Sequence, residues 1–495
     1  MVETKRAAGI ILPISALPSD YGIGTLGQAA YHFIDFLSAA GQTYWQMLPV
    51  GPTSYGNSPY QSFSTFAGNP YFIDLDLLVK DGLLTHEEVA APFWGDDPGR
   101  VDYGAIYQSR FTLLEKAFDR GWNRDADAVA RFSEENREWL PDYALFMALK
   151  RRFGMAAWTD WPDENVRLRR SEAVAWWRGE LDWDVRFFTY MQFLFDGQWR
   201  SLKDYAAAKG ISLIGDLPIY VALDSADVWA KPENYRLDQQ NIPLAVAGVP
   251  PDAFTADGQL WGNPLYNWER MASDGFDWWA RRLRRTLARF DAVRLDHFRG
   301  LESYWAVPYG DPTAATGRWE PGPGEAFIHM LHDRFSDAFI IAEDLGYLTP
   351  EVRDLLEASG YPGMKVLQFA FDHREPSDYL PHRYDANCVC YTGTHDNNTL
   401  LGWLADVDPK DVAHARRYLG LNMVEGFDWG LLRGGMSSVS RLFIAQMQDY
   451  LGLGPEGRMN TPGNGVGNWQ WRMRPGQATA ELAEKINRFT KLYGR

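Results

Sequence analysis

The chain has 495 residues, with 49 Lys and Arg against 65 Asp and Glu, so its formal net charge is −16. This acidic balance argues against nucleic-acid binding and against binding to an anionic membrane. No stretch approaches the run of about 18 apolar residues that a membrane span requires, and the N-terminus has no apolar signal core. The two cysteines, Cys388 and Cys390, resemble buried thiols more than a disulfide framework, so we expect a cytoplasmic protein with neutral or small partners.

The N-terminal part of the chain predicts a strand, a helix and a second strand, over residues 9–14, 28–40 and 43–50. The loop before the helix contains Gly22-Ile-Gly24-Thr-Leu-Gly27, formally a dinucleotide-binding pattern. About eight residues separate this pattern from the strand, whereas the nucleotide fingerprint requires a tight turn. We therefore interpret it as a loop leading into a helix and expect no cofactor.

A long, mostly helical segment follows the second strand. Residues 51–61 are rich in turn formers just beyond a strand end, where ligands bind in barrels and open α/β sheets. Residues 74–210 then show helical patterns without strands. The last helix has Phe188, Phe195 and Trp199 on one apolar stripe, which we interpret as core, and Gly210 as its stop signal. The pattern predicts a large helical insertion after the second strand.

Six further β-rich runs alternate with helical patterns. They cover residues 211–219, 291–296, 338–344, 364–371, 388–394 and 442–448. With the two N-terminal strands they predict an α/β fold of the (β/α)8 TIM barrel type, with a doubly wound open sheet as the alternative. We expect the first two strands within 1–55, the helical insertion and return helix within 56–210, and the remaining barrel within 211–495, with loop insertions at about 222–275 and 305–330.

Acidic residues stand at or just past the ends of four predicted strands: Asp216, Asp296, Glu343 and Asp396. In a barrel this places residues from distant parts of the chain on one rim. Neither the Cys/His spacing of a zinc site nor an Asp-x-Asp-x-Asp-Gly calcium loop occurs. The pattern favours chemistry by carboxylates without a metal.

Two of these carboxylates have different surroundings. Arg294 and Asp296 share one face of a strand, so the guanidinium favours the ionised carboxylate; a structural ion pair is the alternative. Glu343 follows the apolar run Phe339-Ile-Ile-Ala342, where burial would raise its pKa and keep a proton available. A charged nucleophile and a protonated acid are the two groups that a retaining glycosidic mechanism needs, and Asp396 could hold sugar hydroxyls.

The chain resembles the 4-α-glucanotransferases (amylomaltases, or disproportionating enzymes) of glycoside hydrolase family 77, in the α-amylase-like clan. The resemblance rests on motifs spread over nearly the whole chain: Ser58-Pro-Tyr60-Gln-Ser, Gly215-Asp-Leu-Pro-Ile-Tyr220, Gly248-Val-Pro-Pro-Asp252, Leu260-Trp-Gly-Asn-Pro264, Arg294-Leu-Asp-His-Phe298, Ala342-Glu-Asp-Leu-Gly346, Thr394-His-Asp-Asn397 and Gly467-Asn-Trp469. Each motif alone is modest evidence. Their joint occurrence in this order and spacing is specific.

The resemblance implies roles for individual residues. Asp296 would be the nucleophile, Glu343 the acid/base and Asp396 the transition-state stabiliser. The implied substrate-binding residues are Ser58, Tyr60, Asp216, Trp261, Arg294 and His395, with Tyr60 stacking on the donor sugar. His395 and Asp396 are consecutive, so the chain must leave the strand before both can face inward. Residues 247–264 would form a loop over the cleft.

The implied activity is retaining transfer of a glucanosyl segment to the 4-hydroxyl of an acceptor. Maltooligosaccharides and other α-1,4-glucans would be donor and acceptor. The alternatives are an α-1,4-glucan hydrolase and a non-catalytic sugar-binding protein. Only about 47 residues follow the last predicted strand, so we expect no C-terminal β-sandwich domain of the α-amylase kind. The sequence makes no prediction of oligomeric state.

Overall fold

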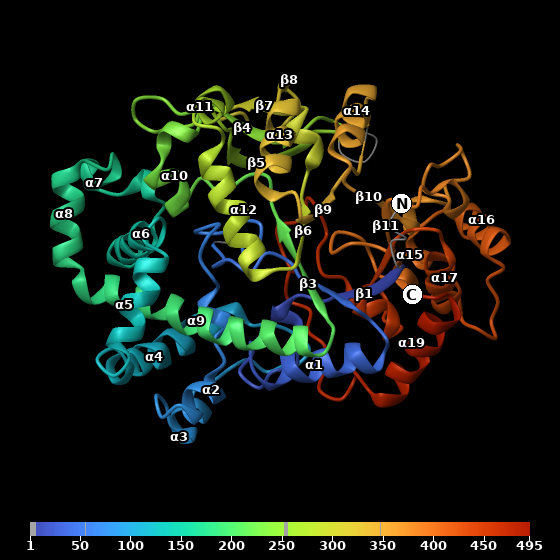
Figure 1. Ribbon diagram of the computed structural model, residues 1–495, viewed down its shortest axis with the longest axis horizontal. Coiled ribbons are helices and arrows are strands. Elements are labelled where there is room, and N and C mark those ends of the chain that lie inside the picture. Colours follow the sequence, from blue (N-terminus) through green and yellow to red (C-terminus); the bar gives the residue numbers. More distant parts are fainter. Residues whose placement is uncertain (1–5, 55, 252–255, 347) are drawn as a thin grey trace.

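The strands of the protein form two separate sheets (Figure 1). A computed structural model describes residues 6–54, 56–251, 256–346 and 348–495. In these residues, eight parallel strands follow the order β10-β11-β12-β1-β2-β3-β6-β9. They are β1 (Ala7–Ile11), β2 (Tyr44–Gln46), β3 (Ser212–Leu217), β6 (Ala292–Leu295), β9 (Phe339–Ala342), β10 (Gly363–Val366), β11 (Cys388–Tyr391) and β12 (Leu442–Gln446).

The eight parallel strands close into a barrel. At the seam between β9 and β10, the Ala342 N–H donates to the Pro362 carbonyl at 3.0 Å. One step further, Asp344 Oδ1 accepts from the Met364 N–H at 2.6 Å. The predicted (β/α)8 barrel is therefore confirmed, and the alternative of an open doubly wound sheet is wrong. Each strand is shorter than its predicted run, because the chain bends out of the ladder where the rim begins.

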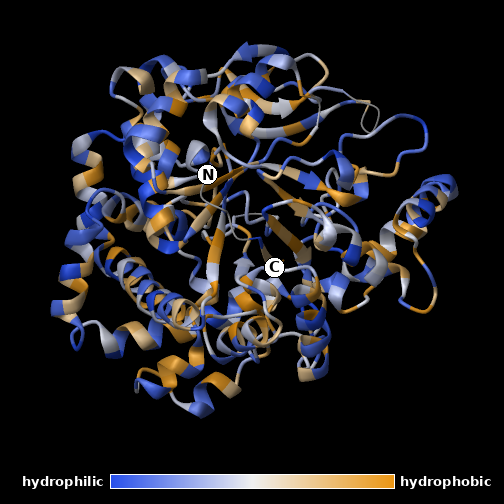
Figure 2. Ribbon diagram, turned by 45° about the vertical axis from the view of Figure 1, so that its right-hand side comes forward, coloured by the Kyte–Doolittle hydropathy of each residue, from blue (hydrophilic) through white to orange (hydrophobic). Residues whose placement is uncertain are grey.

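Helices cover the outside of the barrel. They are α1 (Gln28–Ala39), α12 (Asp277–Arg289), α13 (Gly324–Phe335), α14 (Pro350–Ser359), α15 (Leu400–Asp406), α16 (Pro409–Leu419), α17 (Phe427–Ser437), α18 (Met447–Tyr450) and α19 (Ala480–Leu492). Figure 2 shows several central strands coloured as hydrophobic, whereas the outer helices carry hydrophobic and hydrophilic residues in alternation. Since both faces of the strands are covered, the runs are almost continuously apolar.

The insertion between β2 and β3 is helical, as predicted. It contains α2 (Leu75–Lys80), α3 (His86–Ala90), α4 (Tyr103–Gly121), α5 (Ala126–Glu135), α6 (Leu140–Arg152), α7 (Glu164–Arg167), α8 (Ser171–Glu180) and α9 (Asp182–Ala208). Gly210 follows α9 with φ +73°, the left-handed conformation that commonly ends a helix. Phe195 and Trp199 are buried and stacked, and the Trp199 indole donates to the Arg289 carbonyl of α12. The aromatic stripe is core, as predicted.

The second sheet corrects the expectation of loops at 222–275 and 305–330. It is antiparallel, in the order β5-β4-β7-β8. Its strands are β4 (Ala245–Val249), β5 (Gln259–Pro264), β7 (Ser303–Pro308) and β8 (Arg318–Pro321), and α10 (Ala226–Ala230) and α11 (Trp268–Ser273) belong to the same region. The expected loop at 247–264 is thus strand at both ends; residues 252–255 lie outside the described residues. Sequence missed this sheet because β4 pairs with β7, across the barrel strand β6.

The cysteines, the apolar character of the helices and the two ends of the described chain complete the description of the fold. Cys388 and Cys390 are free and buried, as predicted. No helix in the described ranges is both long and apolar enough to cross a membrane. The two ends of the described chain lie side by side, where the Arg495 side chain donates to the Ala7 carbonyl at 2.9 Å (Figure 1). After β12 the described chain contains only helices and irregular segments, without a β-sandwich.

Candidate active site

Arg294 joins two carboxylates at the rim of the barrel. Asp216 in β3 faces Arg294 in β6 across the ladder, and Arg294 Nη1 lies 2.8 Å from both oxygens of Asp216. The same Nη1 lies 2.9 Å from Asp296 Oδ1, one residue past β6. Burial lowers the pKa of Arg294, but Asp216 and Asp296 together raise it well above its ordinary value. The guanidinium therefore stays charged between two carboxylates.

The two aspartates differ in access. The Asp216 side chain is 0% exposed, and Asp296 is 25% exposed. Both Asp216 oxygens bind Arg294, and one of them also accepts from the Tyr60 hydroxyl at 2.7 Å. Asp296 thus presents its carboxylate to the open rim, whereas Asp216 orients Arg294 and Tyr60 from below.

Glu343 lies just past β9 in a drier setting. Its two oxygens accept from backbone amides, from His297 N–H at 2.7 Å and from Leu345 N–H at 2.9 Å. His297 has the left-handed φ of +52°, which turns its N–H toward the carboxylate. Burial raises the pKa of Glu343 to about 7, although Arg294 opposes the shift. This is the direction predicted from the apolar strand.

His395 and Asp396 lie in the loop between β11 and α15. The chain leaves the strand after Tyr391, as the consecutive pair requires, and a turn forms in which Asn397 Oδ1 accepts from the Thr394 N–H at 2.8 Å. His395 Nε2 lies 3.3 Å from Asp396 Oδ1. This turn points both side chains to the rim.

Asp396 remains charged in a partly exposed position. The Asn460 amide donates to Asp396 Oδ1 at 2.6 Å, and Arg458 donates to the Asp396 carbonyl at 2.7 Å. Burial would raise the pKa of Asp396, but His395 and Asn460 together lower it to about 2. Burial lowers the pKa of His395, but the nearby Asp396 carboxylate raises it. The overall result is a raised pKa.

Aromatic rings line the rim beside these groups. Tyr60 stacks on His395 with ring centroids 4.9 Å apart, and its hydroxyl lies 3.3 Å from His395 Nδ1. Trp469 packs 5.9 Å from Tyr60 and 5.8 Å from His395. Trp261 of β5 meets His297 edge to face at 4.9 Å. The ring faces suit the flat apolar surfaces of sugars.

The structure brings together all but one of the predicted site residues. Asp216, Arg294, Asp296, Tyr60 and His395 form one connected network, and Asp396 joins it through His395. Glu343 accepts a hydrogen bond from the backbone N–H of His297, and the ring of Trp261 contacts the ring of His297. Ser58 stands apart: its hydroxyl accepts from the Tyr60 N–H at 3.2 Å, which supports Tyr60.

Sequence reasoning missed three residues around Asp396. Asn460 and Arg458 bind it directly, and Trp469 packs on His395. Trp469 stood in a motif without an assigned role. No strand pattern marks the segment at 458–469, because it comes from an irregular stretch after the last barrel strand.

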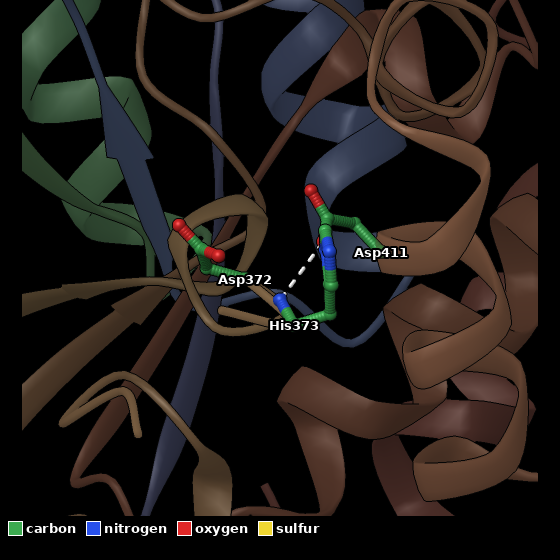
Figure 3. A group of neighbouring side chains, drawn as sticks. All are labelled: Asp372, His373 and Asp411. Atoms are coloured by element: carbon green, nitrogen blue, oxygen red, sulfur yellow. Dashed lines mark hydrogen bonds and ion pairs between the residues drawn. The ribbon is translucent and has the colours of Figure 1, made fainter. Parts of the chain in front are cut away.

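One group of described side chains has the spacing of a metal site, at Asp372, His373 and Asp411 (Figure 3). Its groups already have partners. His373 Nδ1 lies 2.7 Å from Asp411 Oδ1, and Arg374 Nη2 donates to Asp372 Oδ2 at 2.6 Å. The cluster does not need a cation to balance it, and it carries no metal assignment.

The barrel and its rim define a carbohydrate-active enzyme, with one carboxylate beside a guanidinium, another whose pKa burial raises, and aromatic platforms at the C-terminal ends of the strands. A family model described as 4-alpha-glucanotransferase matches residues 12–479. The chain belongs to this family, and its activity is retaining glycosyl transfer between α-1,4-glucans.

Individual relatives agree over the whole length. A 4-alpha-glucanotransferase of Clostridium butyricum is 47% identical and covers 97% of this chain and 99% of its own. One from Thermus thermophilus is 47% identical and covers 98% of each chain. The structure of an amylomaltase from Streptococcus agalactiae in complex with acarbose has 41% identity and a TM-score of 0.97, covering 99% of this chain and 100% of that one.

Proposed function

We propose that the rim network performs the two steps of glucan transfer. The Asp296 carboxylate attacks the anomeric carbon of the donor while Glu343 protonates the departing glycosidic oxygen. Glu343 then takes the proton from the 4-hydroxyl of an acceptor, whose oxygen attacks the same carbon and releases Asp296. The observation that carries this assignment is the contrast between Asp296, 2.9 Å from a buried guanidinium, and Glu343, whose pKa burial raises to about 7.

The remaining residues act on the sugar ring or on the carboxylates. Asp396, whose pKa is lowered to about 2, would hold ring hydroxyls as the ring distorts toward the transition state. Tyr60 and His395 would contact the donor sugar, and Trp261 would contact glucan from the β5 side. Arg294 would orient the Asp296 carboxylate, 2.9 Å away, with Asp216 supporting Arg294 and Ser58 supporting Tyr60.

Maltooligosaccharides and longer α-1,4-glucans would serve as both donor and acceptor. The amylomaltase from Streptococcus agalactiae, with a TM-score of 0.97, was solved in complex with acarbose, an oligosaccharide analogue. The competing outcome is hydrolysis, in which water replaces the acceptor hydroxyl. We also propose a cytoplasmic location, which the two free, buried thiols favour, since disulfides are rare in reducing compartments.

The test is incubation with maltotriose alone, without added metal or nucleotide, following chain lengths and total reducing ends. Transfer predicts glucose and a ladder of longer maltodextrins at constant reducing ends. Rising reducing ends with only shorter products would make the protein a hydrolase. Unchanged maltotriose would point to a sugar-binding protein.

A further inference from the structure

One buried side chain fixes both ends of the loop that carries His395 and Asp396. This loop, residues 392–399, runs from β11 to α15. Asp449 of α18 accepts a hydrogen bond from the Thr392 hydroxyl on Oδ2 at 2.6 Å. Its other oxygen, Oδ1, accepts from the Leu400 N–H at 2.7 Å. A single carboxylate therefore joins the first residue of the loop to the first residue of the helix after it.

The position of Asp449 is costly for stability. The residue is 1% exposed, and no basic side chain of the described chain is among the groups that shift its pKa. Burial raises the pKa of Asp449 to about 7. A buried carboxylate without a cation destabilises the folded state relative to a neutral group of similar shape.

The same short helix also supports the other side of Asp396. Gln448 donates to the Gly457 carbonyl at 3.1 Å, at the start of the segment that brings Arg458 and Asn460 onto Asp396. Among the described residues, the hydrogen bonds of the Asp449 side chain go to Thr392 and Leu400 and not to Asp296, Glu343 or Asp396. Its effect on the rim must therefore pass through the loop backbone.

We propose that Asp449 is a positioning residue for glucan transfer, which holds Asp396 in place by fixing both ends of the loop at residues 392–399. This inference rests on the proposed role of Asp396. A loop without these two bonds can shift by a fraction of an ångström without unfolding, and a displacement of about 1 Å at a reacting group can lower the rate on the order of a hundredfold.

The chain contains a matched control for this arrangement. Asp74, the N-cap of α2, also accepts from a threonine hydroxyl, Thr25 at 2.6 Å, and from a backbone amide, Leu77 at 2.9 Å. It is also buried, at 5% exposed. Thr25→Val and Thr392→Val thus remove the same kind of bond with little change of volume, one in the loop between β1 and α1 and one in the loop that carries Asp396.

The experiment compares kcat, KM and melting temperature for Thr392→Val, Thr25→Val and Asp449→Asn, with maltotriose and with α-maltosyl fluoride as donors. We expect Thr392→Val to lower kcat on the order of tenfold, with KM nearly unchanged. The loss should be equal with the fluoride, because Asp396 serves both donors. Thr25→Val should lower the melting temperature by a similar amount and leave kcat intact, and Asp449→Asn, which still accepts from Leu400, should retain most of the rate.

The outcomes separate this inference from the function it rests on. Equal melting-temperature losses with full activity in Thr392→Val would show that Asp449 is only structural, and would overturn the proposal. Full activity of Asp396→Asn, measured in the same series, would instead overturn the role assigned to Asp396. If Asp449→Asn fails to fold, the activity of Thr392→Val still tests whether Asp449 positions the loop.

Discussion

The two halves of the rim hold their carboxylates by different means. At the β6 and β9 half, Asp296 and Glu343 stand one residue past their strands, and the backbone itself supplies the partners of Glu343. At the β11 half, Asp396 lies within a loop, and it is held by two side chains from one other segment, Arg458 and Asn460, and by its neighbour His395. Strand ends fix position through the ladder, whereas a loop needs added hydrogen bonds. The second half is therefore the one that distant substitutions can disturb.

The largest expected effect is at the strand-end half. Asp296→Asn removes the charge that attacks the anomeric carbon while keeping the shape beside Arg294. Since a covalent step is lost, kcat with maltotriose should fall by about 10⁴-fold or more. Circular dichroism and melting temperature check that the fold is intact. Residual activity within about tenfold of the wild type would exclude Asp296 as the nucleophile.

Glu343→Gln sharpens the comparison between the acid and the nucleophile. Without its proton donor the enzyme should lose about 10²–10⁴-fold in kcat with maltotriose. α-Maltosyl fluoride has a leaving group that needs no protonation, so its release of fluoride should be restored to a large extent. Asp296→Asn is the matched control, because it should stay inactive with both donors. Equal losses for Glu343→Gln with both donors would contradict the acid assignment.

Asn460→Ala tests the loop half directly. It removes the amide that donates to Asp396 at 2.6 Å, so Asp396 should lose orientation and part of its charge stabilisation. A hydrogen bond to a charged group is worth about 1.5–3 kcal/mol, which corresponds to roughly ten- to a hundredfold in kcat/KM. Asn422→Ala, in an exposed loop, is the control and should be without effect. An unchanged rate would mean that His395 and Arg458 suffice to hold Asp396.

The smallest expected effect is a pH dependence. The proton of Glu343 is present below its pKa of about 7 and is lost above it, so kcat/KM should fall about tenfold per pH unit at higher pH. Asp396, with its pKa of about 2, stays ionised through the same pH range, so it does not change the slope of this kcat/KM profile. The pKa of His395 is also raised, so the fall in kcat/KM could belong to either group. Comparing two donor substrates separates them. With α-maltosyl fluoride the fall in kcat/KM at higher pH should disappear if it belongs to Glu343, and persist if it belongs to His395.

The sequence by itself determined the barrel and the strand-end residues. Buried, β-rich runs alternating with helices are local signals, and their parallel pairing follows from the alternation. Asp216, Asp296 and Glu343 were predicted because each stands at or just past a strand end, where topology sets its place on the rim. Arg294 was predicted because it shares a strand face with Asp296. The direction of the Glu343 pKa shift followed from the apolar strand before it.

Only the tertiary structure decided how distant segments meet. The small sheet forms because β4 pairs with β7 across an intervening barrel strand, and no local pattern specifies such a partner. The contacts of Asn460, Arg458 and Trp469 with the β11 loop, and of Asp449 with both its ends, depend on packing of irregular chain. Hydrogen bonds between side chains require positions accurate to a few tenths of an ångström, which residue order and periodicity do not contain.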